Sequence, residues 1–404
     1  MSEQIFSEIV KAQNRLKGIT KYTPLMRSKS FSQMVGANVF LKLENLQNTG
    51  SFKIRGAYNK IMCLSAEERA AGVVCASAGN HAQGVAYGAS QQGVKATVFM
   101  PVFTPALKVI ATKGYGADVQ LVGESYDDAY AAALDFAEQT KATYLHAFND
   151  PQIIAGQGTI GLEILDQLPE VNDIIVPIGG GGLIAGVAAA IKSINPKIRI
   201  IGVEAEGTQS MQKSLEQGEL VNWCTQRTIA DGISVKIPGD LTFELTRQFV
   251  DEVVVVSDEE ISLALYRLLQ RAKVLAEPAG VTPIAAMLAG KVEVAGRNVA
   301  GVISGGNINM GILEQVLEKG MMQEKLRVRL QILIPDVAGE LKRIITLLEQ
   351  AKVNIHDILH ERTLHSVPVG QALIIVTFDT RDYNQLDTIC RELEKQGLTF
   401  SVTE

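Results

Sequence analysis

The sequence predicts an α/β protein followed by a smaller domain of strands and helices in the order βαββαβ. Up to about residue 303, short apolar runs alternate with longer segments of helical period, which is typical of a mostly parallel sheet covered on both faces. Small-residue loops follow three of these runs, and one loop has four consecutive glycines. After residue 322, apolar and polar residues alternate strictly, which indicates half-buried strands.

The strands of the first part are predicted from short, nearly continuous apolar runs. They fall at residues 39–43, 73–76, 96–100, 118–122, 174–178, 198–203 and 299–303. Between them, segments such as residues 127–140 and 258–274 place apolar side chains three and four positions apart. A helix that packs on a sheet requires this spacing.

The last part of the chain predicts a ferredoxin-like βαββαβ domain. Its first strand is residues 326–334, where one face is wholly apolar and the other mostly polar. The next elements are a helix, two strands, a second helix and a last strand, at about residues 341–348, 353–361, 372–378, 386–393 and 398–402. With a boundary in residues 318–325, we expect a main domain over residues 1–320, with a smaller subdomain of about 47–152 inserted in it, and a second domain over 326–404.

Composition and charge argue against several classes of protein. The 404 residues are 47% apolar, enough to bury substantial cores. The net charge of −6 comes from 38 basic and 44 acidic residues without a basic run, which disfavours nucleic acid and anionic membranes as partners. Four cysteines without CxxC spacing disfavour a disulfide framework and a zinc site, and favour a reducing cytoplasm.

No segment predicts export or membrane insertion. The N-terminal residues are polar with a helical period and lack the apolar stretch of a signal peptide. Residues 174–191 are free of charge over 18 positions, but Pro177 and five glycines there indicate a buried strand, a tight loop and a helix. We therefore expect a cytoplasmic protein.

The glycine-rich loop lies within "DIIVPIGGGGLIAGVAAAI", residues 173–191. The order strand, glycines, helix exposes backbone N–H groups at a helix N-terminus, where the helix dipole also favours an anion. Residues 179–182 therefore predict a site for a phosphate group.

The kind of phosphate remains open at this point. Gly180, Gly182 and Ala185 also satisfy the dinucleotide pattern G-x-G-x-x-A, and Glu204 follows about twenty residues later, at the end of the next predicted strand. A nicotinamide-dependent enzyme is thus one interpretation. Tight packing between strand and helix, without any ligand, is another.

A second loop, "ASAGNHAQG" at residues 76–84, also connects a strand to a helix. Ser77 and Gly79 suit a turn whose amides face a ligand, and Asn80 can hydrogen-bond a hydroxyl or an oxyanion. The simpler interpretation is a helix cap. His81 has the chemistry of a catalytic base, but no carboxylate or second histidine lies nearby in sequence.

A third loop, "VISGGN" at residues 302–307, ends another predicted strand. In open parallel sheets, ligands bind at the carboxyl ends of strands. The three loops together therefore predict a single site.

The segment "TGSFKIRGA", residues 49–57, carries Lys53 between two apolar residues. If Phe52 and Ile54 shield the amine from water, its pKa falls from about 10.4 and the amine can act as nucleophile and base. A phosphate-bearing aldehyde held by the glycines would give it a partner. The alternative is a solvated lysine on a helix that Ser51 caps.

As a set and in this order, the motifs resemble those of the threonine and serine dehydratases, and the resemblance runs to about residue 320. The matching segments are "GSFKIRGA" (50–57), "SAGNHAQG" (77–84), "DPQIIAGQGTIGLEI" (150–164), "GGGGL" (179–183), "ADGISV" (230–235) and "SGGN" (304–307). The whole chain resembles a short-form threonine dehydratase. Its last 80 or so residues are similar to an ACT domain, with "PDVAGEL" (335–341) at that family's ligand loop.

This resemblance implies a fold-type II pyridoxal 5'-phosphate enzyme, with two open, twisted, mostly parallel sheets covered by helices on both faces. Lys53 would hold the cofactor as a Schiff base. Asn80 would bind the ring hydroxyl and Ser304 the pyridine nitrogen, while Phe52 would pack near the ring. The cofactor phosphate would lie against Gly179, Gly180, Gly181, Gly182 and Leu183. The substrate carboxylate would bind the amides of Ser77, Ala78, Gly79, Asn80 and His81.

The reaction that the resemblance implies is conversion of L-threonine to 2-oxobutanoate and ammonia, with L-serine giving pyruvate more slowly. Lys53 would remove the α-proton, and the cofactor phosphate would be the acid that assists loss of the hydroxyl. Because the Ser304 hydroxyl is neutral, it cannot keep the pyridine nitrogen protonated. The ring is then a weaker electron sink, which favours β-elimination over transamination.

Two positions distinguish this chain from relatives that racemise serine. Those relatives carry a second serine at the position of Ala78, and alanine has no proton to donate. They also bind a divalent metal through residues that match Glu204 and Ser210, of which the second is an aspartate in them. Loss of a carboxylate ligand speaks against a metal site here. A serine dehydratase or serine racemase of the same family remains the alternative.

Regulation is expected from the C-terminal domain, through an amino acid such as isoleucine or valine at residues 335–341 and through pairing with a second copy. A purely structural dimerisation module is the alternative. Either arrangement predicts a homodimer or homotetramer. His356, His360 and His365 are expected to be solvated rather than metal ligands.

AMP is a second candidate effector, because some catabolic relatives bind it between subunits. The residues that match their contacts are Thr49, Gln83, Tyr115 and Asn307, whereas Asn48 replaces an arginine. The resemblance leaves two metabolic roles open for the enzyme, isoleucine biosynthesis and threonine catabolism. Outside this family, a nicotinamide-dependent oxidoreductase and a non-catalytic amino-acid sensor remain as alternatives.

Overall fold

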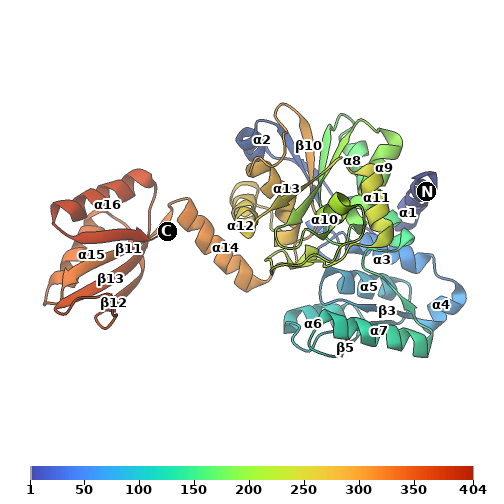
Figure 1. The fold of residues 1–404 in the computed structure, drawn as a ribbon, viewed down its shortest axis with the longest axis horizontal. Coiled ribbons are helices and arrows are strands. Elements are labelled where there is room, and N and C mark those ends of the chain that lie inside the picture. Colours follow the sequence, from blue (N-terminus) through green and yellow to red (C-terminus); the bar gives the residue numbers. More distant parts are fainter. Residues whose placement is uncertain (1, 404) are drawn as a thin grey trace. The chain divides into compact units, whose positions relative to one another are not determined.

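The structure is a computed structural model that describes residues 2–403. Its contacts divide the chain into two compact units, the first ending at Asn309 and the second beginning at Met310 (Figure 1). The domain boundaries expected near residues 318–325 stay a prediction. Each unit is described by itself.

A six-stranded sheet forms the centre of the first unit. The strand order is β1 (Leu25–Arg27), β2 (Asn38–Leu43), β10 (Asn298–Ile303), β7 (Asp173–Pro177), β8 (Arg199–Ala205) and β9 (Glu252–Val256). The edge strand β1 pairs antiparallel with β2, and the other pairings are parallel. Because β7, β8 and β10 lie inside the sheet, nearly all their residues are buried.

Two groups of helices pack around this sheet. The contacts connect α1 (Ser2–Leu16), α8 (Pro151–Gln167), α9 (Gly182–Ile194) and α11 (Asp240–Phe249) to one another, and α9 to strand β7. A second group comprises α2 (Lys29–Val35), α12 (Asp258–Arg267), a π-helical turn (Leu268–Ala272) and α13 (Pro278–Leu288), which packs on β7 to β10. In Figure 1 the two groups lie on opposite sides of the sheet. Helix α10 (Ser210–Gln217) follows β8.

A smaller parallel sheet lies within the same unit, in the order β5 (Asp118–Leu121), β4 (Ala96–Met100), β3 (Val73–Ala76) and β6 (Thr143–Tyr144). Alternate residues of β3 face opposite sides. Val73 and Cys75 pack with α5 (Asn80–Gln91), whereas Val74 and Ala76 pack with α7 (Tyr126–Thr140). The remaining helices here are α3 (Lys53–Met62), α4 (Ala66–Ala71) and α6 (Ala106–Gly114).

The second unit begins with α14 (Met310–Gln323) and continues as a four-stranded antiparallel sheet with two helices. The elements are β11 (Arg327–Pro335), α15 (Glu340–Gln350), β12 (Asn354–Glu361), β13 (Gln371–Asp379), α16 (Tyr383–Lys395) and β14 (Thr399–Thr403). The strand order β12-β13-β11-β14 and the βαββαβ sequence are those of a ferredoxin-like fold. Alternate β11 residues, from Val328 to Ile334, are buried in its core, as the sequence pattern predicts.

The predicted fold class is confirmed. The seven strands predicted for the first part all form. Residues 73–76 and 96–100 match at both ends, and the other five differ by at most two residues at an end. Three strands were not predicted: the short strands β1 and β6, and β9, whose four consecutive valines are a strand signal. The helix predicted over residues 258–274 is regular only to Arg267.

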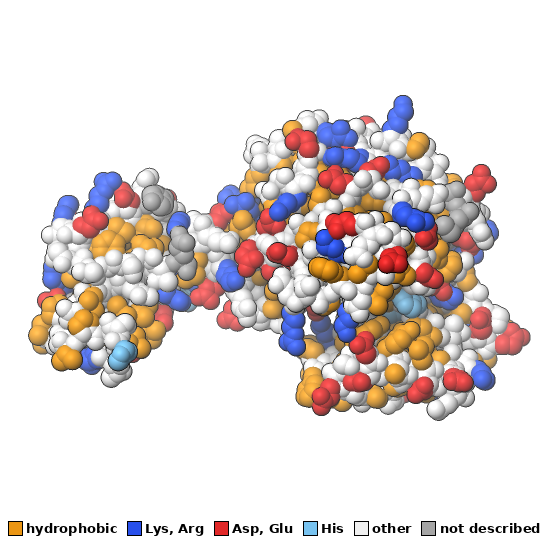
Figure 2. Space-filling view, in the orientation of Figure 1, with side chains coloured by type: hydrophobic (Ala, Val, Ile, Leu, Met, Phe, Trp, Pro, Cys, Tyr) orange, Lys and Arg blue, Asp and Glu red, His pale blue; other side chains and the backbone are white. Residues whose placement is uncertain are grey.

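The surface carries charges of both signs. On the face shown in Figure 2, acidic and basic side chains are interspersed over the first unit, so this face has no large field of one sign. Among the helices of residues 2–403, none combines the length and the apolar character that a membrane span requires.

Candidate active site

Lys53 is the first residue of α3, and the turn before it is fixed against the end of β10. Ser51 forms an isolated β-bridge with Gly305, and the Phe52 N–H donates to Ser304 O over 3.1 Å. The N-cap residue is Phe52, without a side-chain cap, and the buried Ser51 hydroxyl has no hydrogen-bond partner. The interpretation of Ser51 as a helix cap is therefore wrong, because the β-bridge holds Ser51 outside the helix.

The half-buried Lys53 amine hydrogen-bonds a backbone carbonyl and lies beside an aromatic ring. It donates to Ala147 O over 3.0 Å and lies 5.2 Å from the centre of the Phe52 ring, while Ile54 is fully buried. Burial lowers the pKa of Lys53 to about 8, and the nearby Glu277 carboxyl opposes this shift. The amine is thus a nucleophile that is partly neutral near physiological pH.

The four glycines lie between β7 and α9, where the backbone approaches other segments of the chain closely. A Cβ on Gly180 would lie 2.3 Å from the Phe148 ring, and one on Gly182 would lie 2.8 Å from the Phe148 Cβ atom. Gly181 has φ = 90°, which disfavours any larger residue. Helix α9 begins at Gly182, so the glycines present a helix N-terminus, as the phosphate-site prediction requires.

Asn80 connects the second and third predicted loops. It is the first residue of α5, and its Nδ2 atom donates to Glu277 Oε1 over 2.7 Å. Its Oδ1 atom accepts from Asn307 Nδ2, also over 2.7 Å. Ser304 is almost fully buried at the end of β10. The structure therefore brings together the loops that carry Lys53, Asn80 and Ser304.

His81 is only a weak base, because its imidazole is held neutral near neutral pH. Its side chain is buried, and Nε2 lies 2.9 Å from Leu145 O. Burial, reinforced by the charge of Lys53, lowers the pKa of His81 to about 3. Ser77 has a local role, since its hydroxyl accepts from the Gly79 N–H over 3.3 Å.

Two parts of the site were not found from sequence. One is Glu277, which is 6% exposed next to the third loop, and burial raises its pKa to about 7. The other is residues 146–149, which supply Ala147 O to Lys53 and the Phe148 ring to the glycine loop. Glu277 lies 197 positions from Asn80, so no local pattern indicated their contact.

Glu204 is engaged in local contacts. Its two carboxylate oxygens accept the N–H groups of Met211 and Gln212, at 2.9 and 2.8 Å, in the first turn of α10. Burial raises its pKa to about 8. Ser210 donates to Val235 O, and no group of three or more potential metal-ligating side chains occurs within residues 2–403. Because both oxygens are engaged, Glu204 is poorly placed to bind a ribose.

Four residues match the AMP contacts of some relatives, and a hydrogen bond connects two of them. Asn307 Nδ2 donates to Thr49 O over 2.9 Å, which links two of them directly. Gln83 is buried, and the Tyr115 ring meets the Tyr87 ring edge-on at 5.7 Å. Asn48 donates to Ile19 O within the chain.

Comparison with known proteins identifies the class to which this fold and site belong. Residues 16–305 match the family of pyridoxal-phosphate dependent enzymes, and the chain belongs to this family. Its cofactor is pyridoxal 5'-phosphate, which favours the phosphate interpretation of the glycine loop over the dinucleotide interpretation.

Particular relatives narrow the class further. The chain is 47% identical over 390 residues to an L-threonine ammonia-lyase of Thermotoga maritima, covering 96% of this chain and 97% of that protein. An L-threonine ammonia-lyase of Geobacter sulfurreducens is 45% identical over 398 residues, covering 98% and 99%. The processed form of threonine deaminase isoform 2 from Solanum lycopersicum has a TM-score of 0.76 at 37% identity, over 79% of this chain and 94% of that one.

The residues present fit the cofactor. An aldehyde needs an amine that is partly neutral, and Lys53 has a pKa of about 8. A phosphate needs backbone N–H groups at a helix N-terminus, and the four glycines lead into α9, which begins at Gly182. Both features belong to the same unit, and residues 146–149 contact both.

Replacing Lys53 by methionine should give a pH-dependent gain in stability when the protein is free of cofactor. The pKa of Lys53 is about 8 in the folded protein and 10.5 as its ordinary value. The cost of burying the charge is therefore full below pH 8 and disappears as the pH rises towards 10.5. Below pH 8 we expect Lys53→Met to raise the free energy of unfolding by up to about 3 kcal/mol.

Denaturant unfolding of the cofactor-free protein at several pH values between 7 and 10 measures this difference. The exposed Lys95→Met variant is the control and should show no such trend. A stability difference for Lys53→Met that stays constant with pH would show that the amine is not desolvated.

Proposed function

We propose that the protein is an L-threonine ammonia-lyase, which converts L-threonine to 2-oxobutanoate and ammonia and acts on L-serine more slowly. The observation that carries the proposal is the half-buried Lys53 amine, whose pKa is lowered to about 8 and which donates to Ala147 O. The chain is also similar over nearly its whole length to two L-threonine ammonia-lyases. A cofactor-bound electron sink and a neighbouring base are what α-proton removal requires.

Bound pyridoxal phosphate supplies an electron sink for negative charge at the substrate α-carbon. Lys53 would hold the cofactor through its amine and move the α-proton. The backbone of Gly179, Gly180, Gly181, Gly182 and Leu183 would bind the phosphate. Phe52 would pack near the ring. The Ser304 hydroxyl would contact the pyridine nitrogen without keeping it protonated.

Asn80 would donate a hydrogen bond to the ring hydroxyl. One of its N–H bonds is directed to Glu277, and its oxygen accepts from Asn307. The second N–H bond of the same amide is then available to a ligand. Glu277 and Asn307 thus orient the Asn80 amide, which supports the proposed contact.

The substrate carboxylate would bind backbone N–H groups of residues 77–81. Ala78, Asn80 and His81 are the proposed donors, because the Ser77 N–H donates to Phe99 O over 3.1 Å and the Gly79 N–H donates to the Ser77 hydroxyl. These residues lead into the N-terminus of α5, where the helix dipole favours an anion. Ala78 has no proton to donate to the α-carbon, and His81 is not a proton donor near neutral pH because its pKa is about 3. Elimination is therefore favoured over racemisation.

Full-length protein should be yellow and should release an oxoacid from L-threonine. Lys53→Ala should abolish the visible absorbance and lower turnover by at least about a thousandfold, because nucleophile and base are lost together. Lys95→Ala, at an exposed position, is the matched control and should retain both. A colourless wild type that binds no added pyridoxal phosphate would contradict the proposal, as would oxoacid release by Lys53→Ala at the wild-type rate.

The second unit is proposed to bind an aliphatic amino acid such as isoleucine or valine. A hollow beside residues 335–341 is lined by Val337, Leu341 and His360, among others. Asp336 accepts from Arg362 Nε over 2.9 Å, and helix α15 begins just after Gly339. An amino acid would find a carboxylate for its ammonium group and a helix N-terminus for its carboxylate. Assembly as a homodimer or homotetramer and a cytoplasmic location remain predictions.

Calorimetric titration of the full-length protein with L-isoleucine and L-valine tests this site. Asp336→Asn should weaken binding by about tenfold or more, because a charge-assisted hydrogen bond is lost. Asp357→Asn, at an exposed carboxylate on β12, is the control. Binding of AMP with no response to either amino acid would instead favour the site near Thr49, Gln83, Tyr115 and Asn307.

A further inference from the structure

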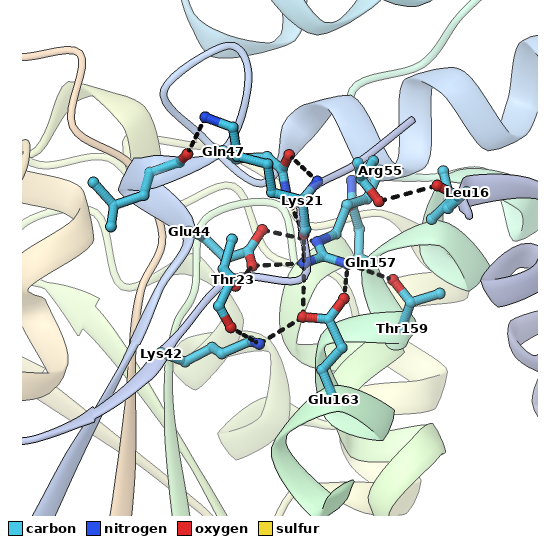
Figure 3. Close-up of polar contacts among 12 residues, drawn as sticks. Leu16, Lys21, Thr23, Lys42, Glu44, Gln47, Arg55, Gln157, Thr159 and Glu163 are labelled. Carbon is cyan, nitrogen blue, oxygen red and sulfur yellow. Dashed lines mark hydrogen bonds and ion pairs between the residues drawn. The ribbon is translucent and has the colours of Figure 1, made fainter. Parts of the chain in front are cut away.

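In its first turn, helix α3 carries two basic side chains, Lys53 and Arg55, which lie in different environments. The Lys53 amine donates to Ala147 O at the proposed active site. Arg55, two positions later, extends into a buried network of charged groups (Figure 3) and is 1% exposed. No part of the proposed reaction uses this network.

The first link of the network is a two-point ion pair between Arg55 and Glu44. Arg55 Nε lies 2.8 Å from Glu44 Oε2, and Arg55 Nη2 lies 2.8 Å from Glu44 Oε1. Glu44 directly follows β2, so the pair joins the two ends of residues 44–55. This segment carries Phe52 and Lys53 between its joined ends.

The second link fastens that closed segment to α8. Arg55 Nη1 lies 2.6 Å from Glu163 Oε1 and 3.2 Å from Thr159 Oγ1, and Arg55 Nη2 lies 3.0 Å from Glu163 Oε2. Lys42 on β2 completes the set, with its amine 2.5 Å from Glu163 Oε2 and 2.7 Å from Thr23 O. Two cations thus face two carboxylates, and the buried charges balance.

Close packing leaves α3 little freedom around these links. A Cβ on Gly56 would lie 2.7 Å from Ile153 O, and one on Gly156 would lie 2.4 Å from Arg55 O. On the side of α5, a Cβ on Gly84 would lie 3.0 Å from the Lys53 carbonyl carbon. A small shift of the network would therefore move the backbone of Lys53.

Stability alone is a weak reason for such a network. Buried ion pairs are often replaced by well-packed apolar residues without loss of stability, because desolvation of the charges offsets their attraction. The planar guanidinium does supply fixed directions, because each of its edges can hold a carboxylate at two points. Arg55 uses this geometry toward both Glu44 and Glu163.

We propose that Arg55 is a positioning residue for Lys53: through Glu44 and Glu163 it fixes residues 44–55, and thereby the place and water exclusion of the Lys53 amine. This inference rests on the proposed function, in which Lys53 holds pyridoxal phosphate. It assigns to Arg55 a role in the chemistry although Arg55 contacts neither cofactor nor substrate.

Four full-length holoenzymes test the proposal: the wild type, Arg55→Lys, the double variant Arg55→Met/Glu44→Gln, and Asp173→Asn as control. Lysine keeps the positive charge but lacks the planar guanidinium that holds each carboxylate at two points. The double variant removes one cation and one anion together, so that Lys42 and Glu163 remain a balanced pair. Asp173 is a fully buried carboxylate that binds Arg199 and Arg297 at the start of β7, away from residues 44–55.

Three experiments are carried out on each protein. The first measures the rate at which hydroxylamine removes the bound cofactor, which reports how well the Lys53 linkage is held and shielded from water. The second measures kcat and KM for L-threonine, and the third measures the midpoint of thermal unfolding. The unfolding midpoint distinguishes variants in which the whole protein is less stable from variants in which only Lys53 is displaced.

Arg55→Lys and the double variant are expected to lose the cofactor at least about tenfold faster than the wild type. Their kcat should fall at least about tenfold while KM changes less, because a displaced amine impairs the chemical step. The double variant should show these losses even where its unfolding midpoint is close to that of the wild type. Asp173→Asn should lower the unfolding midpoint but leave the release rate within about twofold.

Other results overturn the proposal. Wild-type release rates and kcat in both Arg55 variants would show that the network does not position Lys53. Changes that follow the unfolding midpoint in all variants, including Asp173→Asn, would assign it a structural role only. A wild type that holds pyridoxal phosphate but releases no oxoacid from L-threonine would refute the proposed function and leave the release-rate comparison valid.

Discussion

The site depends on one constraint, the placement of the Lys53 amine against Ala147 O and the Phe52 ring. Burial lowers the pKa of this amine to about 8, so that it is partly neutral at a pH where an exposed lysine is fully charged. The β-bridge from Ser51 to Gly305 and the hydrogen bond from Phe52 to Ser304 fix the turn before it. The rest of the site is arranged around an amine that is already in place.

The sheet topology explains why residues far apart in sequence meet near this amine. In parallel sheets the carboxyl ends of neighbouring strands lie at one edge. The glycine loop follows β7, residues 304–307 follow β10, and Asn80 follows β3 of the smaller sheet. In the proposed function each loop would make a different contribution: a helix N-terminus for phosphate, a neutral hydroxyl, and an amide that Glu277 and Asn307 orient.

Much of this arrangement could be predicted from the sequence, because the signals are local. Apolar runs placed seven strands, strict alternation placed β11, and four glycines marked the start of α9. The signals for Glu277 and Arg55 are not local. Each is a charged residue whose burial depends on partners more than a hundred positions away, Asn80 for Glu277 and Glu163 for Arg55. The interpretation of Ser51 as a helix cap is wrong because its β-bridge partner, Gly305, is distant in sequence and no local pattern indicates the pairing.

The most direct test of the account is to find the residue that carries the cofactor. Borohydride reduction of the full-length holoenzyme makes the linkage permanent, and peptide mass spectrometry then locates it. We expect the added mass on the peptide that contains Lys53, and on no other lysine. A modified lysine elsewhere, or a reduced protein without added mass, would contradict the central claim.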